Sequence, residues 1–390
     1  MNKNRKKTII TTGLLIAFFA LLIVIEQYIS PRDQMSMLLT VLKKGAIYAL
    51  VAVSMNLLNG FTGLFSLGQA GFMLIGAYSY AIFTIPAAER DGVYRYYDNA
   101  INFSFPEVLE NIMGGPGMML GVIIAVLLAG IIAAGIAFLI GLPVLKLRSD
   151  YLAIATLGFA EIIRAVFQWG RLGPVTNGSN PLRNYVRQNA FTMELGAKSI
   201  NLSTFVLVFL AAFCIGVIVL LVNSSYGRAF KAVREDEVAA EAMGINLYRH
   251  KQMSFCISSF FTGIGGALLA IFMGTVTANN FKAAMTYELL LIVVLGGIGS
   301  ISGSVIGALL FVFASEWWLR GLDSGTFLGI SIPLFRNGFR LVVFSVIIML
   351  VVLFFRKGIM GDRELPAMLG QWGEKLFKRK RGSKAGEENG

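Results

Sequence analysis

The stretch MMLGVIIAVLLAGIIAAGIAFLIGL, residues 118 to 142, decides the class of the fold. It contains no charged residue, and it is longer than the roughly 20 residues with which a helix crosses about 30 Å of hydrocarbon. Similar apolar runs recur along nearly the whole chain of 390 residues, which is 56% hydrophobic and only 14% charged. Soluble domains carry about a quarter of their residues as charged groups. The sequence therefore predicts an all-α integral membrane protein.

These apolar runs predict about ten transmembrane helices. The candidate spans cover residues 8 to 29, 38 to 58, 64 to 86, 118 to 142, 150 to 170, 203 to 223, 252 to 274, 285 to 297, 301 to 319 and 338 to 356. The first run follows a basic N-terminus and resembles a signal peptide, but it is too long and lacks a small-residue cleavage site. We therefore expect it to remain as the first span.

The charges predict the orientation of the chain. An even number of spans places both ends on one side, and both ends are strongly basic, which indicates the cytoplasm. The basic loops at 143 to 149 and 224 to 251 then also lie inside, and 87 to 117, 171 to 202 and 320 to 337 lie outside. The net charge of +12 is thus a topology signal, and we expect no nucleic-acid partner.

The chain divides into three parts on this basis. Residues 1 to 37 form a basic cytoplasmic end and the first span, residues 38 to 356 form the main transmembrane domain, and residues 357 to 390 form a basic cytoplasmic tail. The stretch at 87 to 117 is the longest outer loop, and it is either a partly ordered surface loop or a docking surface.

The loop GRAFKAVREDEVAAEAMGINLYRHK, residues 227 to 251, is far less hydrophobic than its flanks. Good helix formers run from Ala229 to Met243, and Gly244 is a natural C-cap, so the pattern predicts one short amphipathic helix. Its acidic and small residues, which another protein could approach closely, are Glu235, Asp236, Glu237, Ala239, Ala240 and Ala242. The alternative is a solvated helix that only connects two spans.

Two glycine-rich segments echo each other, GFTG at 60 to 63 and GGIG at 296 to 299. Such segments are typical of broken helices in transporters built from two inverted halves, here of five helices each, which place substrate sites near the midplane. Candidate residues of a substrate path are Asn56, Gly60, Thr62, Gly63, Ser66, Gln69, Gly296 and Gly297. Each polar one could equally bond a neighbouring helix.

Charged groups inside the predicted spans are few. Glu161 and Arg164 are three residues apart on one helix, so they are predicted to pair, either as a functional group or as an internal structural ion pair. Cys214 and Cys256 each lie in an apolar run, and we expect neither a disulfide nor a metal site. No GxxxxGK[ST] phosphate loop and no catalytic set of side chains occurs in the sequence, so we expect no enzyme activity and no cofactor on this chain.

Four segments in this order resemble LivM-type permeases of branched-chain amino acid ABC transporters. They are NGFTGLFSLGQAGFMLIGAY (59 to 78), KLRSDYLAIATLGFAEIIR (146 to 164), GRAFKAVREDEVAAEAMGIN (227 to 246) and VVLGGIGSISGSVIGA (293 to 308). Val238, Ala239, Ala240 and Gly244 also resemble the looser coupling signature of ABC importers, although its leading Glu is shifted to Glu237.

The resemblance implies a role and a set of partners. The chain would be an inner-membrane permease subunit that moves Leu, Ile or Val, and residues 235 to 244 would couple it to ATPases. Its partners would be a homologous second permease, two P-loop ATPase subunits holding ATP and magnesium, and an extracytoplasmic binding protein. Permeases for urea or ribose-type sugars, an ion-coupled secondary transporter and a membrane receptor are the alternatives.

Overall fold

The computed structural model describes residues 34–318 except 148, 196 and 197, together with 19–24, 26, 27 and scattered positions between 326 and 364. The longer helices are α2 (Gln34–Asn56), α3 (Gln69–Thr84), α5 (Phe105–Met113), α6 (Gly115–Val144), α7 (Ser149–Gln168), α9 (Ser203–Asn223), α10 (Ser225–Glu235), α12 (Leu247–Met273), α13 (Ala283–Gly296) and α14 (Ile301–Phe313).

Short elements join these helices. They are η1 (Leu57–Phe61), η2 (Ala87–Glu89), α4 (Arg90–Val93), η3 (Gly170–Leu172), α8 (Gly173–Thr176), η4 (Gln188–Ala190), α11 (Glu237–Ala242), η5 (Ala278–Asn280) and η6 (Ala314–Trp318). The strands β1 (Thr192–Leu195) and β2 (Lys198–Asn201) form one antiparallel hairpin, and β3 (Thr326–Phe327) and β4 (Ile330–Ser331) form another. Over the residues that the structure describes, the fold is thus all-α apart from two small hairpins.

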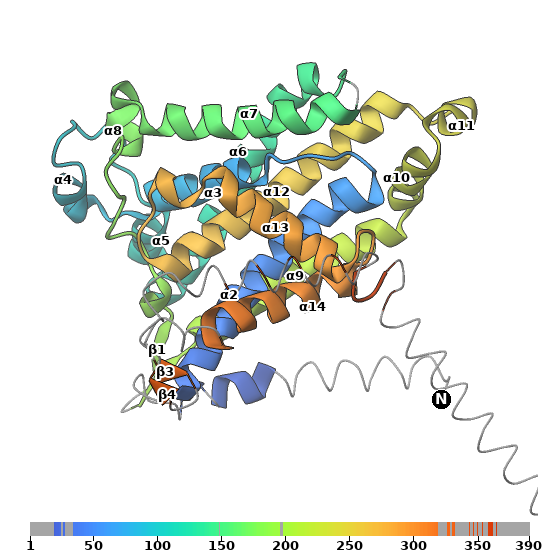
Figure 1. Cartoon of the computed structure of the whole chain (residues 1–390). Helices are drawn as coiled ribbons and strands as arrows, with labels where there is room; N and C mark the ends of the chain where they lie inside the picture. The colour runs from blue at the N-terminus through green and yellow to red at the C-terminus, as the bar shows by residue number, and fades with distance from the viewer. Residues whose placement is uncertain are drawn as a thin grey trace, which may run out of the picture.

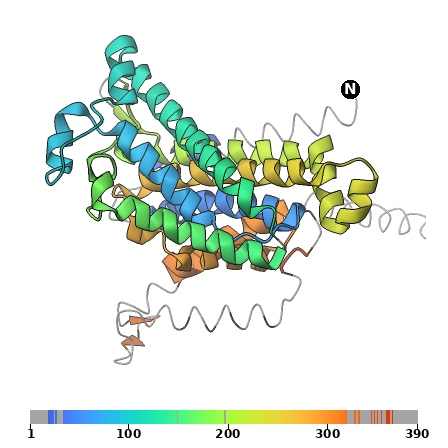
Figure 2. The same ribbon diagram turned by 90° about the horizontal axis from the view of Figure 1, so that it is seen from above.

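The helices form a bundle with two distinct ends. The end that carries α10 and α11 is called the coupling end, and the opposite end, which carries α4, α8 and the β1–β2 hairpin, is called the loop end (Figure 1). The view from above shows the same separation (Figure 2). The loop at 224 to 251 therefore lies opposite the loops at 87 to 117 and 171 to 202, as the charge pattern predicts.

The predicted spans from 38 to 319 each have a helical counterpart. Among the described residues, six helices are long and apolar enough to cross a membrane, α3 with the segment to Val93 forms a pair bent by 102°, and Ile301–Trp317 is a shorter apolar helix. The observed bounds of α9 are those expected, Ser203–Asn223. The predicted spans 8 to 29 and 338 to 356 lie largely outside the described residues.

Small residues set the centre of the bundle, where α12 packs along both α3 and α6. Gly76 of α3 lies directly against the backbone of Gly263, and Gly266 of α12 lies against the backbone of Met73. A methyl group at Gly130 of α6 would come within 2.9 Å of Ile264. Because lipid provides no hydrophobic drive between helices, such close backbone approach is what holds membrane helices together.

The stretch at 87 to 117 is more ordered than a surface loop. It contains α4 and α5, and the fully buried Arg90 holds them to the end of α3. The guanidinium of Arg90 donates to the carbonyls of Ile82 (3.0 Å) and Phe103 (2.5 Å), and also to that of Ile101. A buried cation surrounded by carbonyl oxygens fixes the loop, since each lost partner would leave it poorly solvated.

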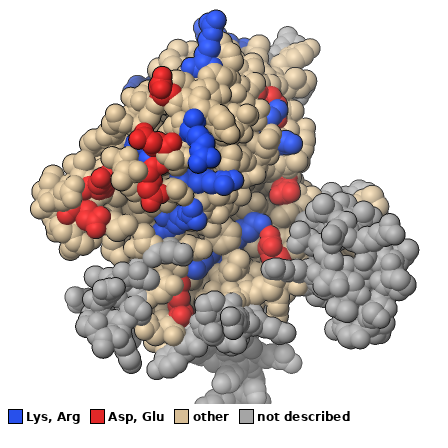
Figure 3. Space-filling view, turned by 90° about the vertical axis from the view of Figure 1, so that its left-hand side faces the viewer, with Lys and Arg blue, Asp and Glu red and all other residues tan. Residues whose placement is uncertain are grey.

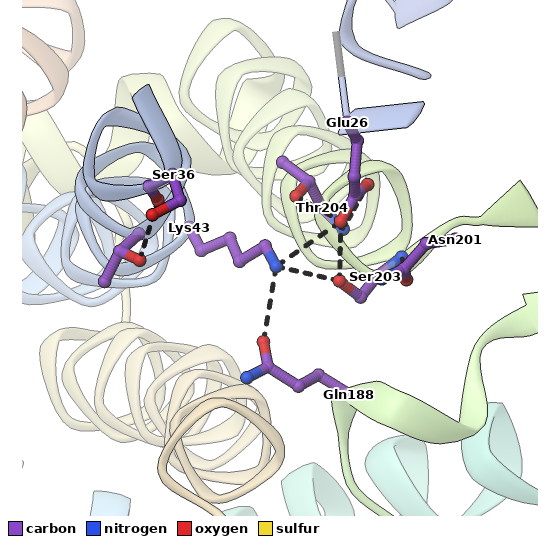
Figure 4. A network of polar contacts seen from close by, with 8 residues as sticks. Glu26, Ser36, Lys43, Gln188, Asn201, Ser203 and Thr204 are labelled. Carbon is purple, nitrogen blue, oxygen red and sulfur yellow. Dashed lines mark hydrogen bonds and ion pairs between the residues drawn. The ribbon is translucent and has the colours of Figure 1, made fainter. Parts of the chain in front are cut away.

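The loop end is rich in charges of both signs. Basic side chains run across this face beside acidic ones (Figure 3). A half-buried lysine connects α2 to three other segments. Lys43 donates to Ser203 at 2.8 Å and to Gln188 at 3.3 Å, and its ammonium lies 3.5 Å from the carboxylate of Glu26 (Figure 4). Glu26 also accepts from the backbone N–H of Thr204 at 3.0 Å, so its carboxylate caps the start of α9.

Candidate functional site

The predicted coupling helix is two helices rather than one. Asp236 has an extended backbone (φ −157°, ψ 111°) that separates α10 from α11. Its carboxylate accepts from the backbone N–H groups of Val238 (2.8 Å) and Ala239 (3.0 Å), so it caps the start of α11. Propensity favoured a continuous helix, but an Asp that satisfies two free N–H groups stabilises a new helix start instead.

The end of α11 is fixed as the sequence predicts, at Gly244. This residue adopts φ +84°, which glycine reaches without steric cost. The N–H of Gly244 donates to Glu241 O at 2.9 Å, and the N–H of Ile245 donates to Ala240 O at 3.1 Å. An ion pair of 2.6 Å between Lys251 and Glu237 ties α11 to α12. The two helices and α12 thus form one braced unit, which we call the coupling hairpin (residues 225 to 251).

Of the residues expected on the approach face of the coupling hairpin, Ala240 alone is buried, and the exposed ones are Glu235, Asp236, Glu237, Ala239 and Ala242. Phe230, Val233 and Ala240 are buried, so Ala240 belongs to the packed side and not to an approach face. Val238 and Met243 are 78% and 83% exposed. Both apolar side chains are therefore accessible to a partner protein.

The inner side of α10 contacts the first glycine-rich segment. The ammonium group of Lys231 lies 5.5 Å from the centre of the Phe61 ring. Gly63 adopts φ +76°, and a Cβ there would lie 3.2 Å from Arg234. η1 and the non-helical residues that follow it interrupt the path of the chain between α2 and α3. The hairpin therefore rests directly on a break in the membrane helices.

The second glycine-rich segment meets the first at this same place. The side-chain amide of Asn56 donates to Ser300 O (2.9 Å) and Ser304 Oγ (2.8 Å), and its carbonyl oxygen accepts from the N–H of Gly299 at 2.8 Å. A Cβ on Gly60 would come within 2.7 Å of the same N–H group. GFTG and GGIG are thus two helix breaks in direct contact, although they lie far apart in the sequence.

The other predicted path residues are buried and already bonded. Thr62 donates to Leu57 O at 3.0 Å, and Ser66 Oγ accepts from Gly68 N at 3.4 Å. Gln69 bonds α12 twice, donating to Ser258 (3.3 Å) and accepting from Thr262 (2.7 Å). Gly296 and Gly297 form the close turn into α14. In this conformation Gln69 ties α3 to α12, whereas Thr62 and Ser66 bond nearby backbone. The place of these groups on a substrate path stays a prediction.

The pair of Glu161 and Arg164 is confirmed. The guanidinium donates to the carboxylate at 2.7 Å, and the other oxygen of Glu161 accepts from the N–H of Ala283 at 3.2 Å. Glu161 therefore also caps the start of α13 and connects it to α7. This contact favours the structural interpretation of the pair over a functional one.

A cavity of about 760 Å³ opens beside the coupling hairpin. Lys231, Arg234 and Glu235 line it on one side, and Ser302 and Glu364 line it on the other. The carboxylate of Glu364 accepts from the N–H groups of Ile301 (2.7 Å) and Ser302 (3.1 Å) at the start of α14. No pattern in the sequence signals this contact, because Glu364 follows the last predicted span in an otherwise basic tail.

Within the described residues, no group of three His, Cys, Asp or Glu side chains could hold a metal ion. Both cysteines are free thiols. The polar groups at the two breaks bond one another and the backbone. The coupling hairpin contacts the first of these breaks, and Asn56 connects that break to the second.

A bundle of membrane-length helices, with two breaks meeting beside an exposed surface hairpin, defines a multi-pass membrane transport protein. Within that class the chain belongs to the family of the branched-chain amino acid transport system permease component, whose model matches residues 37–355.

Individual relatives agree with this family. The chain is 32% identical over 291 residues to the high-affinity branched-chain amino acid transport system permease protein LivM of Escherichia coli (strain K12), covering 69% of this chain and 61% of the relative. A probable branched-chain amino acid transport permease protein LivM of Methanocaldococcus jannaschii is 24% identical over 68% of this chain and 76% of its own length. The permease protein LivH of Salmonella typhimurium is 32% identical over 36% of this chain and 42% of its own length. No solved structure matches.

Proposed function

We propose that this chain is the permease subunit of an ATP-driven ABC importer that moves leucine, isoleucine or valine across the inner membrane. Two P-loop ATPase subunits bind at the coupling end, a second homologous permease lies beside this one, and an extracytoplasmic binding protein delivers the amino acid at the loop end. Residues 235 to 244 carry the ATPase contact. The chain spans 61% of the length of the E. coli LivM relative.

The observation that carries the proposal is the coupling hairpin itself. Val238 and Met243 offer an apolar surface to a partner, while Lys231 and Arg234 behind them touch the helix break at 60 to 63. Asn56 connects this helix break by hydrogen bonds to the turn before α14. If an ATPase subunit closes on ATP and moves the hairpin, both helix breaks would therefore shift together. The nucleotide would then favour one of two conformations of the helix bundle over the other.

Charge and contacts at the ends support the orientation. After the last predicted span, the N–H groups of Ile359 and Met360 donate to Leu295 O (2.8 Å) and Gly296 O (3.2 Å), at the same end as α10. The basic tail that follows thus begins at the coupling end. Because basic segments stay in the cytoplasm, we place the coupling end and both termini there.

A second permease is supported by the pattern of relatives. Both LivM and LivH match this chain, which indicates that homologous permeases of two kinds share this fold. Glu288 and Tyr287 are exposed on α13 of the single chain. Because a carboxylate at membrane depth is costly against lipid, a neighbouring protein subunit or water should cover this side.

Uptake in the native host tests the proposed function. A strain lacking this chain should lose uptake of labelled leucine at growth-limiting concentration and regain it when the chain is restored, and its uptake of labelled urea should not change. The chain purified from the restored strain should carry a stoichiometric P-loop ATPase. Unchanged leucine uptake in the deletion strain, or a purified chain without any ATPase, would contradict the proposal.

A further inference from the structure

A second cavity, of about 420 Å³, lies at the loop end between α2, the end of α12 and the start of α13. It is separate from the cavity beside the coupling hairpin, with which it shares no lining residue. Its size falls within the range of roughly 300 to 1,000 Å³ that small-molecule sites occupy. The cavity lies at the loop end, where the proposed binding protein delivers the amino acid.

Charged groups of both signs line this cavity. They are Lys44 on α2, Lys282 just before α13, and Glu288 in the second turn of α13. Lys44 pairs with Glu316, with 25% and 27% of the two side chains exposed, and its ammonium lies 5.4 Å from the Tyr48 ring centre. The ion pair with Glu316 holds the ammonium group of Lys44 in the wall of the cavity.

Glu288 is the one carboxylate among the residues that line this cavity. It makes no hydrogen bond or ion pair with the part of the chain that the structure describes, and it is exposed. Lys44 and Glu316 are the charged groups that act on it electrostatically. A carboxylate without a partner in a membrane helix needs water or a cationic ligand to offset its desolvation.

The rest of the wall is apolar. Leu269 and Phe272 come from α12, and Met285 comes from α13. Leu269 and Met285 are buried beneath the surface of the cavity, and Phe272 is partly exposed. One wall is thus aliphatic and aromatic, and charges of both signs stand at its edge.

We propose that this cavity is a transient binding site for an α-amino acid in its zwitterionic form, an inference that rests on the proposed function. Glu288 accepts from the ammonium group, Lys44 and Lys282 bind the carboxylate, and the branched side chain lies against Leu269, Phe272 and Met285. A sugar or urea offers neither charge, and a purely cationic or anionic solute would leave one of the two signs without a partner. Partial exposure keeps binding weak enough for release.

Leucine binding to the purified transporter complex in lipid nanodiscs, without the binding protein, tests this site. Equilibrium dialysis with labelled leucine should show saturable binding. Glu288→Gln should weaken it by about 10- to 100-fold, because a charge-assisted hydrogen bond is lost. Lys282→Gln should weaken it in the same direction. Glu110→Gln, an exposed carboxylate of α5 outside the cavity, is the matched control and should bind as the unaltered complex does.

Analogues identify the contact that each charge makes. Leucinamide lacks the carboxylate and isocaproate lacks the ammonium, so both should compete poorly for the unaltered complex. The Glu288→Gln complex should no longer distinguish leucine from isocaproate.

Two results separate the site from the function. If the unaltered complex takes up leucine in cells but Glu288→Gln binds leucine and analogues identically to it, the site is wrong and the proposed function stands. If the unaltered complex neither takes up nor binds leucine, both are wrong.

Discussion

Replacing Val238 and Met243 together by glutamate should abolish leucine uptake while the chain remains in the membrane. Both side chains project from the coupling hairpin, 78% and 83% exposed, and neither contributes to the packed side formed by Phe230 and Ala240. The change removes two apolar anchor residues, each worth about 2 kcal/mol or more of binding free energy. It also places two carboxylates in an apolar groove of the partner, where their desolvation is costly. The ATPase should no longer co-purify, and uptake should fall by about a hundredfold or more, to background.

The conservative pair Val238→Ile with Met243→Leu is the matched control for this change. It keeps an apolar surface of similar size, so ATPase binding and uptake should both persist. Membrane abundance of both variants, measured by immunoblot, should equal that of the unaltered chain. Normal uptake by the glutamate variant would show that this surface does not couple transport to ATP hydrolysis.

The second large effect concerns folding. Gly76→Val should prevent accumulation of a stable bundle, because a side chain there would overlap the backbone of Gly263 where α3 crosses α12. The obstacle is main chain rather than a flexible side chain, so it cannot rotate away. We expect a cost of about 3 kcal/mol or more, a large share of the stability of a domain.

Gly135→Val is the matched control for the packing prediction. Gly135 lies on α6, and no atom lies within 4 Å of the position that a Cβ would take there, so the added group meets open space. Fluorescence-detected size-exclusion chromatography after heating compares the two variants. Gly76→Val should be lost or aggregate at lower temperature, and Gly135→Val should match the unaltered chain. Equal stability of both variants would contradict the close approach of α3 and α12.

Much of this architecture could be predicted because membrane helices are encoded locally. Runs of apolar residues define the spans, and α9 begins and ends where hydropathy places it. Gly244 was recognisable as a helix end because a positive φ is nearly specific to glycine. The pair of Glu161 and Arg164 was predictable because residues three apart share one face of a helix.

What could not be predicted depends on contacts between distant segments or on competition within a few residues. Asp236 stops α10 because its carboxylate bonds two N–H groups, and helix propensity alone does not include that competition. The contact of Asn56 with the turn before α14 and the cap that Glu364 places on α14 join residues far apart in the sequence. The hydropathy pattern predicts neither contact.

The cavity lined by Lys44 and Glu288 also could not be predicted from the sequence. Each residue looks like an isolated charge in an apolar run, and only the packing of α2 against α13 places them around one space. The sequence therefore directed attention to the polar residues near the glycines. The structure instead shows Asn56 and Gln69 bonded between helices and Thr62 and Ser66 bonded to nearby backbone. It shows Glu288 without a hydrogen bond or ion pair among the described residues.

Site-specific photo-crosslinking tests the central claim most directly. A photo-reactive amino acid placed at Met243 in cells should crosslink this chain to a P-loop ATPase subunit, and the same group placed at Ile112, which is 73% exposed on α5 at the loop end, should not. Capture of the ATPase from position 243 alone would establish that the coupling hairpin is its docking surface. Capture from position 112 alone, or labelling of position 243 by a reagent that cannot enter the cytoplasm, would contradict the account.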